Sequence, residues 1–301
     1  MTEKSLFITI TGLTNAGKSS LLNTLTGEKI AAVTPKPQTT RTRITGIRTE
    51  NYDNESIQYV FYDTPGVQPK PQNKLGEQMN KTVKDAENGV DIIIFVCDLS
   101  KKSTDSETNL LRSLNPAKTI LLLNKTDTVK DKGEIADRIA LLTAGKNFYS
   151  VIPVSVRRND GMDILKNTLK KAAKPSVHFF PDDKFTVEAE ESLAAEMIRE
   201  NILISLSEEI PHGTAVAIEK FAERTAASGD DILDVEALIY CEKESHKGII
   251  IGKKGIMLKK IGEMSRTSLE NFFRIKVNLK LWVKVREDWR NREVFVNKFT
   301  L

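Results

Sequence analysis

The sequence predicts an α/β fold with a doubly wound, mostly parallel sheet, followed by a smaller α+β domain. Three observations lead to this prediction. The 301 residues exceed what a single compact core usually contains. From residue 5 to about residue 173, apolar runs alternate with segments of helical spacing. The alternation stops at 174–185, where two prolines occur without any period, and a different order of elements follows.

The apolar runs of the first part have the features of buried strands. Most are continuous stretches rich in β-branched residues or leucine, as in strands covered on both faces. Residues 43–53 instead form an antiparallel hairpin with the next run, turning near Asp53 and Asn54. A helix between two strands implies a right-handed crossover connection, and strands connected in this way are parallel. The remaining strands should therefore be parallel. We expect strands at 6–12, 56–63, 91–98, 118–125 and 149–156, and helices at 19–27, 73–88, 106–114, 133–145 and 161–173.

The second part has its own order of elements. We expect domain boundaries at 1–174 and 189–301, with 175–188 as the linker. After the linker come a helix (189–208), two strands (214–221 and 233–242) joined by a polar loop (222–231), a short helix, a longer helix (255–272) and a strand (275–285).

Composition and charge limit the kinds of function. No apolar run approaches the ~20 residues that span a bilayer, and the N-terminus lacks the features of a secretory signal. The two cysteines and three histidines have no metal-ligand spacing, so we expect a cytoplasmic protein without zinc. Residues 241–301 hold 15 Lys and Arg against 7 Asp and Glu. This local basic excess points to a polyanionic partner, although a solvated basic face would explain the charge alone.

Residues 12–19, GLTNAGKS, match the phosphate-binding pattern GxxxxGK[ST] between a strand and a helix. The glycines let the backbone curl so that N–H groups point at phosphate oxygens, and the helix adds its positive end. Lys18 would lie between the β- and γ-phosphates, and the Ser19 hydroxyl would bind Mg²⁺. The nucleotide contacts expected here are Gly12, Asn15, Ala16, Gly17, Lys18, Ser19 and Ser20.

Two further segments suit the γ-phosphate. Asp63 and Gly66 belong to DTPG at the end of the third strand, where the carboxylate can reach Mg²⁺ and the Gly66 N–H can meet the γ-phosphate. A plain turn would explain a lone DTPG, but not one downstream of a P-loop. The proline-containing loop 29–43 holds several threonines and suits a segment ordered by γ-phosphate and Mg²⁺.

The base-recognition residues follow the fifth and sixth strands, at the edge where open sheets bind ligands. Asp127, in Asn124-Lys125-Thr126-Asp127, can accept two hydrogen bonds from guanine, whereas adenine would leave the carboxylate unpaired. Lys125 would stack along the base, and Asn124 would tie its loop to the P-loop. Backbone N–H groups at Ser155 and Val156 would meet the guanine oxygen. The sequence therefore predicts GTP rather than ATP.

The P-loop, QTTR (38–41), DTPG and NKTD resemble the translation-factor-related GTPases that serve RNA and ribosomes. The resemblance implies that Thr40 is a Mg²⁺ ligand together with Ser19 and Asp63. It also implies that Lys18, Thr40, Asp63 and Gly66 form the catalytic set.

Two positions bear on K⁺ binding and on the rate of GTP hydrolysis. Asn15 matches an asparagine that supports K⁺ binding in several members of this group, although an ordinary turn residue fits equally well. Val67 stands where Ras-like proteins carry a water-orienting glutamine, so the sequence names no catalytic base. We therefore expect slow intrinsic turnover, on the order of 10⁻³ s⁻¹ or below.

A GxxG loop, Gly252-Lys253-Lys254-Gly255, lies between two expected helices of the second part. Such a loop lets a nucleic-acid backbone approach closely, although a bare helix–helix turn explains most GxxG occurrences. Its helix–strand–strand–helix–helix–strand context resembles the type II KH domain. The residues expected to contact RNA are Gly252, Lys253, Lys254, Gly255, Lys247 and Lys259, with Lys260 and Arg266 nearby.

A P-loop GTPase followed by a type II KH domain resembles the Era family over essentially the whole chain. The resemblance implies a GTP/GDP- and Mg²⁺-dependent switch that binds the 3′ end of small-subunit ribosomal RNA and acts in assembly of the 30S-type subunit. It further implies a monomer and allows peripheral association with the cell membrane. Two departures are Val156, where the family usually has alanine, and the tail after Trp289.

Alternative functions and assignments remain open at this point. The chain could be an RNA-binding module with a regulatory, poorly hydrolysing GTP site. A tRNA-modification or membrane-linked GTPase would need a folate, cysteine or lipid site, which the second part does not offer. The amphipathic segment 192–206 fits a KH core helix better than a membrane contact. Trp282, in 279–285, fits a stacking surface or, more simply, a strand with alternating faces.

Overall fold

The computed structural model describes residues 2–68, 70–207 and 210–300. The chain forms two compact units, and each contains pieces from different parts of the sequence. The first unit contains Met1–Ile30, Thr40–Pro71 and Met79–Val187, and the second contains Ala31–Thr39, Gln72–Gln78 and Glu188–Leu301.

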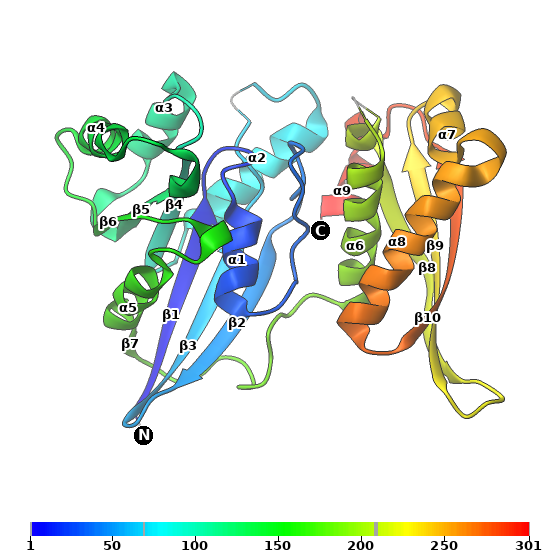
Figure 1. Cartoon of the computed structure of the whole chain (residues 1–301), viewed down its shortest axis with the longest axis horizontal. Helices are drawn as coiled ribbons and strands as arrows, with labels where there is room; N and C mark the ends of the chain where they lie inside the picture. Colours follow the sequence, from blue (N-terminus) through cyan, green and yellow to red (C-terminus); the bar gives the residue numbers. More distant parts are fainter. Residues whose placement is uncertain (1, 69, 208–209, 301) are drawn as a thin grey trace. The chain divides into compact units, whose positions relative to one another are not determined.

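The sheet of the first unit has the strand order β2-β3-β1-β4-β5-β6, with β7 beside β1 (Figure 1). The β2–β3 pair is antiparallel and β1, β3, β4, β5 and β6 are mutually parallel, so the expected hairpin and mostly parallel sheet are confirmed. The strands are β1 (Thr2–Thr11), β2 (Ile44–Asn51), β3 (Glu55–Asp63), β4 (Ile92–Asp98), β5 (Thr119–Asn124), β6 (Ser150–Pro153) and β7 (Lys174–Pro175). The helices of this part of the chain are α1 (Lys18–Thr26), α2 (Lys74–Glu87), α3 (Asp105–Ser113), α4 (Lys132–Thr143) and α5 (Met162–Ala172).

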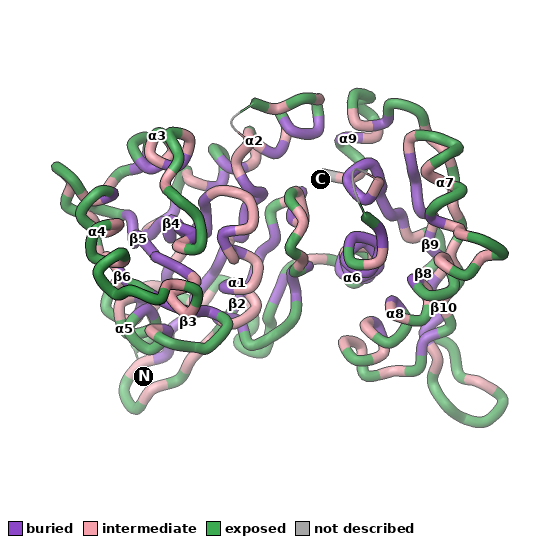
Figure 2. The backbone as a smooth tube through the Cα atoms, turned by 45° about the horizontal axis from the view of Figure 1, so that its top comes forward, coloured by how far each residue is buried: buried purple, intermediate pink, exposed green. Residues whose placement is uncertain are grey.

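The central strands are buried on both faces. Every residue of β4 and β5 is buried, as their unbroken apolar sequences require, and Figure 2 shows this buried centre within the unit. Apart from Thr119 at the start of β5, polar residues occur only where these strands end: Asp98 closes β4 and pairs in register with Asn124, which closes β5. The parallel arrangement therefore brings the ends of β1, β3, β4 and β5 to one edge of the sheet.

The second unit is an α+β structure with the sheet order β10-β9-β8. β8 and β9 are antiparallel, whereas β9 and β10 are parallel. One face of the sheet packs with α6, α7 and α8 around an aliphatic core that includes Ile198, Val235 and Ile261. The elements are α6 (Glu190–Ser205), β8 (Ala215–Thr225), β9 (Asp231–Cys241), α7 (Glu244–Ile251), α8 (Ile256–Phe273), β10 (Lys276–Val285) and α9 (Glu293–Thr300).

The expected polar loop 222–231 is wrong for half of its length. β8 continues to Thr225 and β9 begins at Asp231, so the hairpin closes through a short turn in which Ala226 N donates to Asp230 O. Polar side chains do not prevent pairing here because Arg224 bonds Asp234 on the solvent side of the sheet (3.1 Å). The backbone ladder thus extends beyond the apolar core.

Residues 175–188, expected as a linker, contact the first unit along much of their length. Ile47 N donates to Phe185 O (2.8 Å), and the Thr186 hydroxyl donates to Thr45 O (2.6 Å). The Gln58 side chain is fully buried, and its oxygen accepts from the backbone N–H groups of residues 179 and 180. A buried amide needs such partners, so Gln58 fixes the path of this segment.

The tail after β10 folds back onto the second unit. Trp289 is fully buried, its indole N–H donates to Gly213 O (2.9 Å), and its ring contacts Phe299 of α9. Sequence reasoning did not predict α9, because its eight residues give only two turns and no capping signal.

Replacing Trp289 by Phe should destabilise the protein by about 1–3 kcal/mol, because Gly213 O would lose its buried donor and a small void would remain. Urea unfolding followed by circular dichroism measures the change. Trp282→Phe is the matched control. Because Trp282 is 46% exposed, the free energy of unfolding of this variant should stay within about 0.5 kcal/mol of the wild-type value. Equal effects of the two substitutions would contradict the role of Trp289.

Candidate functional site

The loop between β1 and α1 requires its glycines. Gly12 has φ 141°, and a Cβ there would lie 2.5 Å from Val96 O. Gly17 has φ 98°, and a Cβ would lie 2.3 Å from the Asn124 side-chain nitrogen. Only glycine accepts these angles at such close approach, and helix α1 then begins at Lys18.

Lys18 is held across the mouth of this loop. Its ammonium donates to Gly12 O (3.2 Å) and Leu13 O (2.9 Å), and the residue is buried. Burial lowers the pKa of Lys18 to about 8, and the nearby Asp63 carboxylate opposes this shift. The loop therefore concentrates a partly desolvated positive charge where a phosphate would favour it.

Three oxygen-bearing side chains from three segments meet beside Lys18. Ser19 Oγ lies 2.7 Å from Thr40 Oγ1 and donates to Asp63 Oδ2 (2.7 Å). Asp63 is fully buried, which raises its pKa to about 6 against the pull of Lys18, and its Oδ1 has no hydrogen-bond partner in the described residues. A buried carboxylate oxygen without a partner beside two hydroxyls fits a hard cation such as Mg²⁺.

Gly66 and Val67 approach the phosphate loop directly. A Cβ at Gly66 would lie 2.5 Å from the Thr14 side chain, so glycine permits this contact. Val67 N donates to Gly12 O (3.4 Å), and Val67 pairs with Leu13 in an isolated bridge. The Val67 side chain supplies no proton acceptor at this point.

Asn124 joins the phosphate loop to two other loops. Its side-chain nitrogen donates to Ala16 O (2.9 Å), so the structure contains the link expected from the sequence. Its side-chain oxygen accepts from the backbone of Lys125 (2.8 Å) and of Val156 (3.2 Å). Asn124 is buried, and its bonds to Ala16 and Val156 are shielded from water.

Asp98 is a site residue that sequence reasoning missed. Lys125 Nζ bonds Asp98 Oδ2 (2.7 Å) and also Asn15 O (2.9 Å), which fixes the lysine stem. Burial opposes ionisation of Asp98, but hydrogen bonds from Lys125 and Ser100 outweigh it and hold its pKa below the usual value. The available signal was its position at the end of β4, directly beside Asn124 in the sheet.

Asp127 and Ser155, each expected to contact the base, are hydrogen-bonded to each other. The Ser155 hydroxyl donates to Asp127 Oδ1 (2.6 Å), and this bond holds the pKa of Asp127 below its ordinary value. The turn after β6 places Ser155 and Val156 beside the Asn124 loop. The remaining expected residue, Ser20, lies on α1, where its carbonyl accepts from Thr24 Oγ1 (2.9 Å).

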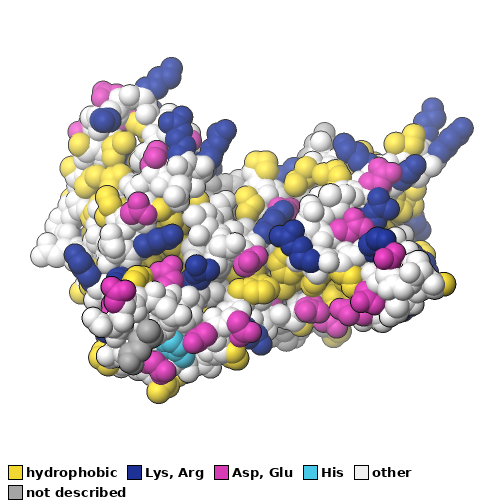
Figure 3. All heavy atoms as spheres, turned by 60° about the horizontal axis from the view of Figure 1, so that its bottom comes forward, with side chains coloured by type: hydrophobic (Ala, Val, Ile, Leu, Met, Phe, Trp, Pro, Cys, Tyr) yellow, Lys and Arg dark blue, Asp and Glu magenta, His cyan; other side chains and the backbone are white. Residues whose placement is uncertain are grey.

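The GxxG segment forms a tight turn between α7 and α8. Gly252 has φ 71°, and a Cβ there would lie 2.7 Å from Met257 Cβ. Gly255 has φ 80° and Lys254 has φ 53°. Lys253 and Lys254 are exposed, whereas Lys247 and Lys259 pair loosely with Glu244 (3.8 Å) and Glu263 (3.9 Å) on their own helices. The face drawn in Figure 3 likewise carries charges of both signs.

A groove of about 370 Å³ opens beside this turn, between α8 and β10. Leu279 and Leu281 of β10 form its apolar wall, and sequence reasoning did not assign them to a site. Its lining comprises Gly255, Leu258, Lys259, Gly262, Glu263, Arg266, Leu279 and Leu281. The apolar wall suits bases, and Lys259 and Arg266, with Glu263 between them in sequence, put a net positive charge beside it for phosphates.

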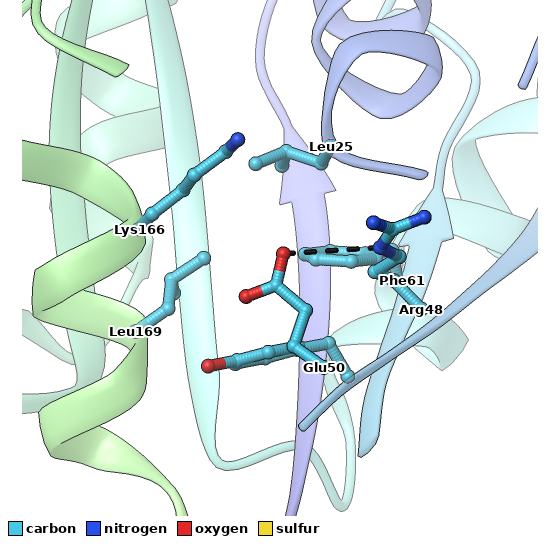
Figure 4. A pocket seen from close by; sticks show the side chains of 7 residues that line it. Leu25, Arg48, Glu50, Phe61, Lys166 and Leu169 are labelled. Atoms are coloured by element: carbon cyan, nitrogen blue, oxygen red, sulfur yellow. Dashed lines mark ion pairs between the residues drawn. The ribbon is translucent and has the colours of Figure 1, made fainter. Parts of the chain in front are cut away.

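A second, smaller cavity lies in the first unit beneath the Arg48–Glu50 ion pair (3.8 Å; Figure 4). Its volume is about 10 Å³, enough for about one water molecule. It is lined by Leu25, Arg48, Glu50, Tyr59, Phe61, Lys166 and Leu169. This cavity is too small for a nucleotide or other organic ligand.

Three further features bear on metal binding, membrane insertion and disulfide formation. Within residues 2–68, 70–207 and 210–300, no three His, Cys, Asp or Glu side chains gather as a metal site. Over the same residues, no helix combines the length and apolar character that crossing a bilayer requires. Cys97 and Cys241 are buried free thiols.

Comparison with known proteins covers both units. Residues 7–125 match the family described as 50S ribosome-binding GTPase, and residues 209–290 match the KH domain family. GTPase Era of Clostridioides difficile is 43% identical over 98% of both chains. That of Ruminiclostridium cellulolyticum is 41% identical over 97% of this chain and 96% of its own.

Two solved structures have the same fold over nearly the full length. An Aquifex aeolicus Era variant bound to GDP and AlF₄⁻ gives a TM-score of 0.92 at 31% identity and covers both chains completely. Era in complex with MgGDPNP and nucleotides 1506–1542 of 16S ribosomal RNA gives 0.92 at 32% identity, covering 99% of this chain and 100% of that one. Because the relatives are more than 40% identical over nearly the whole chain and both family models match, this protein belongs to the Era family of GTPases.

Proposed function

We propose that this protein is a GTP-hydrolysing switch that binds the 3′ end of small-subunit ribosomal RNA and acts in assembly of that subunit. The observation that carries the proposal is the meeting of Ser19, Thr40 and Asp63 beside Lys18. These residues come from separate segments, and the unpartnered Oδ1 of buried Asp63 beside two hydroxyls suits a cation at the phosphates of a nucleotide.

The phosphate end follows from this cluster. Ser19, Thr40 and Asp63 would hold Mg²⁺, which supplies charge neutralisation for the β- and γ-phosphates. Lys18 places its ammonium on the same phosphates, and the Gly66 N–H faces the γ-phosphate. Because Thr40 lies in a loop, its position depends on what the cluster holds. The backbone of Gly12, Asn15, Ala16, Gly17, Lys18, Ser19 and Ser20 would surround the phosphate chain.

The base end selects guanine. Asp127 accepts hydrogen bonds from the guanine ring N–H and amino group, and Ser155 orients this carboxylate. Lys125, clamped by Asp98, lies along the base plane. Asn124 holds Val156 N near the guanine oxygen. Valine at 156 donates through its backbone, so its side chain does not prevent this contact.

Hydrolysis requires an attacking water, and Val67, next to Gly66, offers it no side-chain base. Val67 occupies the position next to the phosphate loop, which supports slow turnover. We include K⁺ near Asn15 in the proposal on the family resemblance at this position, although the φ of 63° at Asn15 suits an ordinary turn residue equally well. An alternative is a regulatory GTP site with negligible hydrolysis, which the apolar Val67 would favour.

RNA binding is assigned to the groove beside the GxxG turn. A KH domain clamps about four nucleotides with this turn, using apolar walls for the bases and lysines for the phosphates. Lys253, Lys254, Lys247 and Lys259 rim the turn and the adjoining helices. The Era–16S complex supports the choice of RNA. We further propose that a monomer works on the 30S-type subunit in the cytoplasm, with peripheral membrane contact as a secondary location.

Replacing Lys18 by Ala should reduce phosphate release from GTP to the uncatalysed background, because the other ammonium at the phosphate loop, that of Lys125, is held by Asp98 and Asn15 O on the base side. Single-turnover phosphate release with purified protein, Mg²⁺ and either KCl or NaCl measures this. Lys171→Ala, on the exposed side of α5, is the control and should keep the wild-type rate. Equal rates in wild type and Lys18→Ala would favour the non-hydrolysing alternative.

Replacing Asp127 by Asn should weaken GTP binding strongly and improve XTP binding, because an amide can donate to the xanthine oxygen. Competition between the two nucleotides for a fluorescent analogue reports the change. Asp137→Asn on α4 is exposed and should alter neither affinity. Unchanged GTP preference in Asp127→Asn would refute the base-recognition role.

Replacing both Lys253 and Lys254 by Asp should abolish RNA binding and leave GTP binding intact. Asp tolerates the left-handed angles of position 254, so the turn should persist. Binding of labelled RNA corresponding to nucleotides 1506–1542 of 16S rRNA measures the loss. The control carries the same charge change at Lys130 and Lys132, exposed residues of the first unit. Wild-type RNA affinity in the Lys253/Lys254 variant would contradict the assignment.

A further inference from the structure

Strand β10 presents two different faces. Its apolar residues Leu279, Leu281, Val283 and Val285 pack against the core on the side of α7 and α8. Because side chains alternate along a strand, Trp282 points to the opposite face together with the lysines two residues before and after it. Trp282 is 46% exposed, whereas the other tryptophan, Trp289, is fully buried. A large aromatic ring is thus partly open to solvent, and no ring contact or hydrogen bond of Trp282 is found among the described residues.

The surroundings of Trp282 are apolar across the sheet and basic along the strand. In register it faces Leu238 of β9, which is half-buried. Lys280 pairs with Glu236 (3.1 Å), but Lys284 has no carboxylate within 4.0 Å among the described residues. We call Leu238, Lys280, Trp282 and Lys284 the Trp282 face. Tyr240, in register opposite Lys284, contacts Phe295 and Phe299 of α9, so the face ends there.

The Trp282 face and the GxxG groove lie on the two sides of the same strand, β10. β10 is an edge strand, paired only with β9 among the described strands. Leu279 and Leu281 line the groove on its inner side, and Trp282 lies between them and Val283 in sequence but on the outer side. A polynucleotide leaving the groove over the free edge of β10 therefore meets Trp282 next.

We propose that the Trp282 face is a second contact for single-stranded RNA, in which the indole stacks on one unpaired base while Lys284 and Lys280 meet the neighbouring phosphates. The inference rests on the proposed RNA binding by the GxxG groove and extends its footprint. Base–aromatic stacking flanked by basic side chains is the usual way to hold single strands without sequence preference. The lysines on both sides of the ring match a polyanion better than an apolar protein surface.

The test compares short and long RNA on the full chain. One probe is a ~4-nucleotide single strand that fills only the GxxG groove, and the other is a ~10-nucleotide strand that extends past it. In Trp282→Ala, affinity for the longer strand should fall about 5- to 150-fold, as expected for one lost stack, with no change for the shorter strand. Trp282→Phe should keep most of the affinity, whereas Trp282→Leu, apolar but not aromatic, should not.

Fluorescence provides a direct readout of the same contact. Because Trp289 is buried, quenching of indole emission by the longer strand should come from Trp282 and disappear in Trp282→Phe. Equal affinity of wild type and Trp282→Ala for the longer strand, or quenching that persists in Trp282→Phe, would overturn the inference. If the Trp282 face instead binds another protein, wild type and Trp282→Ala should bind the longer strand with equal affinity.

The outcomes also separate this inference from the proposed function. If the short strand binds wild type but not the Lys253→Asp/Lys254→Asp variant, the assignment of RNA binding to the groove holds. This conclusion does not depend on the result for Trp282→Ala. If neither strand binds wild type, the proposed RNA function itself fails.

Discussion

The buried side chain of Asn124 is the interaction on which the nucleotide site depends. One amide accepts from two backbone N–H groups and donates to Ala16 O, so it fixes the phosphate loop and both base-recognition loops relative to one another. Each loop by itself is an irregular segment at a strand end. A single side chain that satisfies three backbone groups makes them one rigid site, and Asp98 extends it by holding Lys125.

The site also carries buried charge that the protein alone does not fully compensate. Burial lowers the pKa of Lys18 to about 8 and raises that of Asp63 to about 6, so each group is less stable ionised here than in water. Phosphate and a divalent cation would reverse both effects. Nucleotide binding should therefore stabilise the first unit as well as occupy it, since a ligand that binds only the folded state shifts the folding equilibrium.

Features that depend on local sequence could be predicted, and features that depend on distant partners could not. The unbroken apolar runs of β4 and β5 fixed the parallel sheet, and motif residues at strand ends placed Lys18, Asp63 and Asp127 in one region. Asp98 carries no motif, and its role exists only because Lys125 lies beside it in space. Likewise, Gln58 and Trp289 anchor segments that are far away in sequence. The end of β8 was missed because solvent-facing polar residues are compatible with both a loop and a strand.

The left-handed backbone at Lys254 has a consequence for how the GxxG turn can change. A lysine with φ 53° is strained by about 1 kcal/mol relative to glycine, which adopts these angles freely. Glycine would thus make the turn more stable but remove one of its two exposed charges. Lys254 therefore keeps the positive charge of the turn at the cost of some stability. This turn is therefore a place where stability and polyanion affinity oppose each other, and selection for a more heat-resistant chain would erode the second.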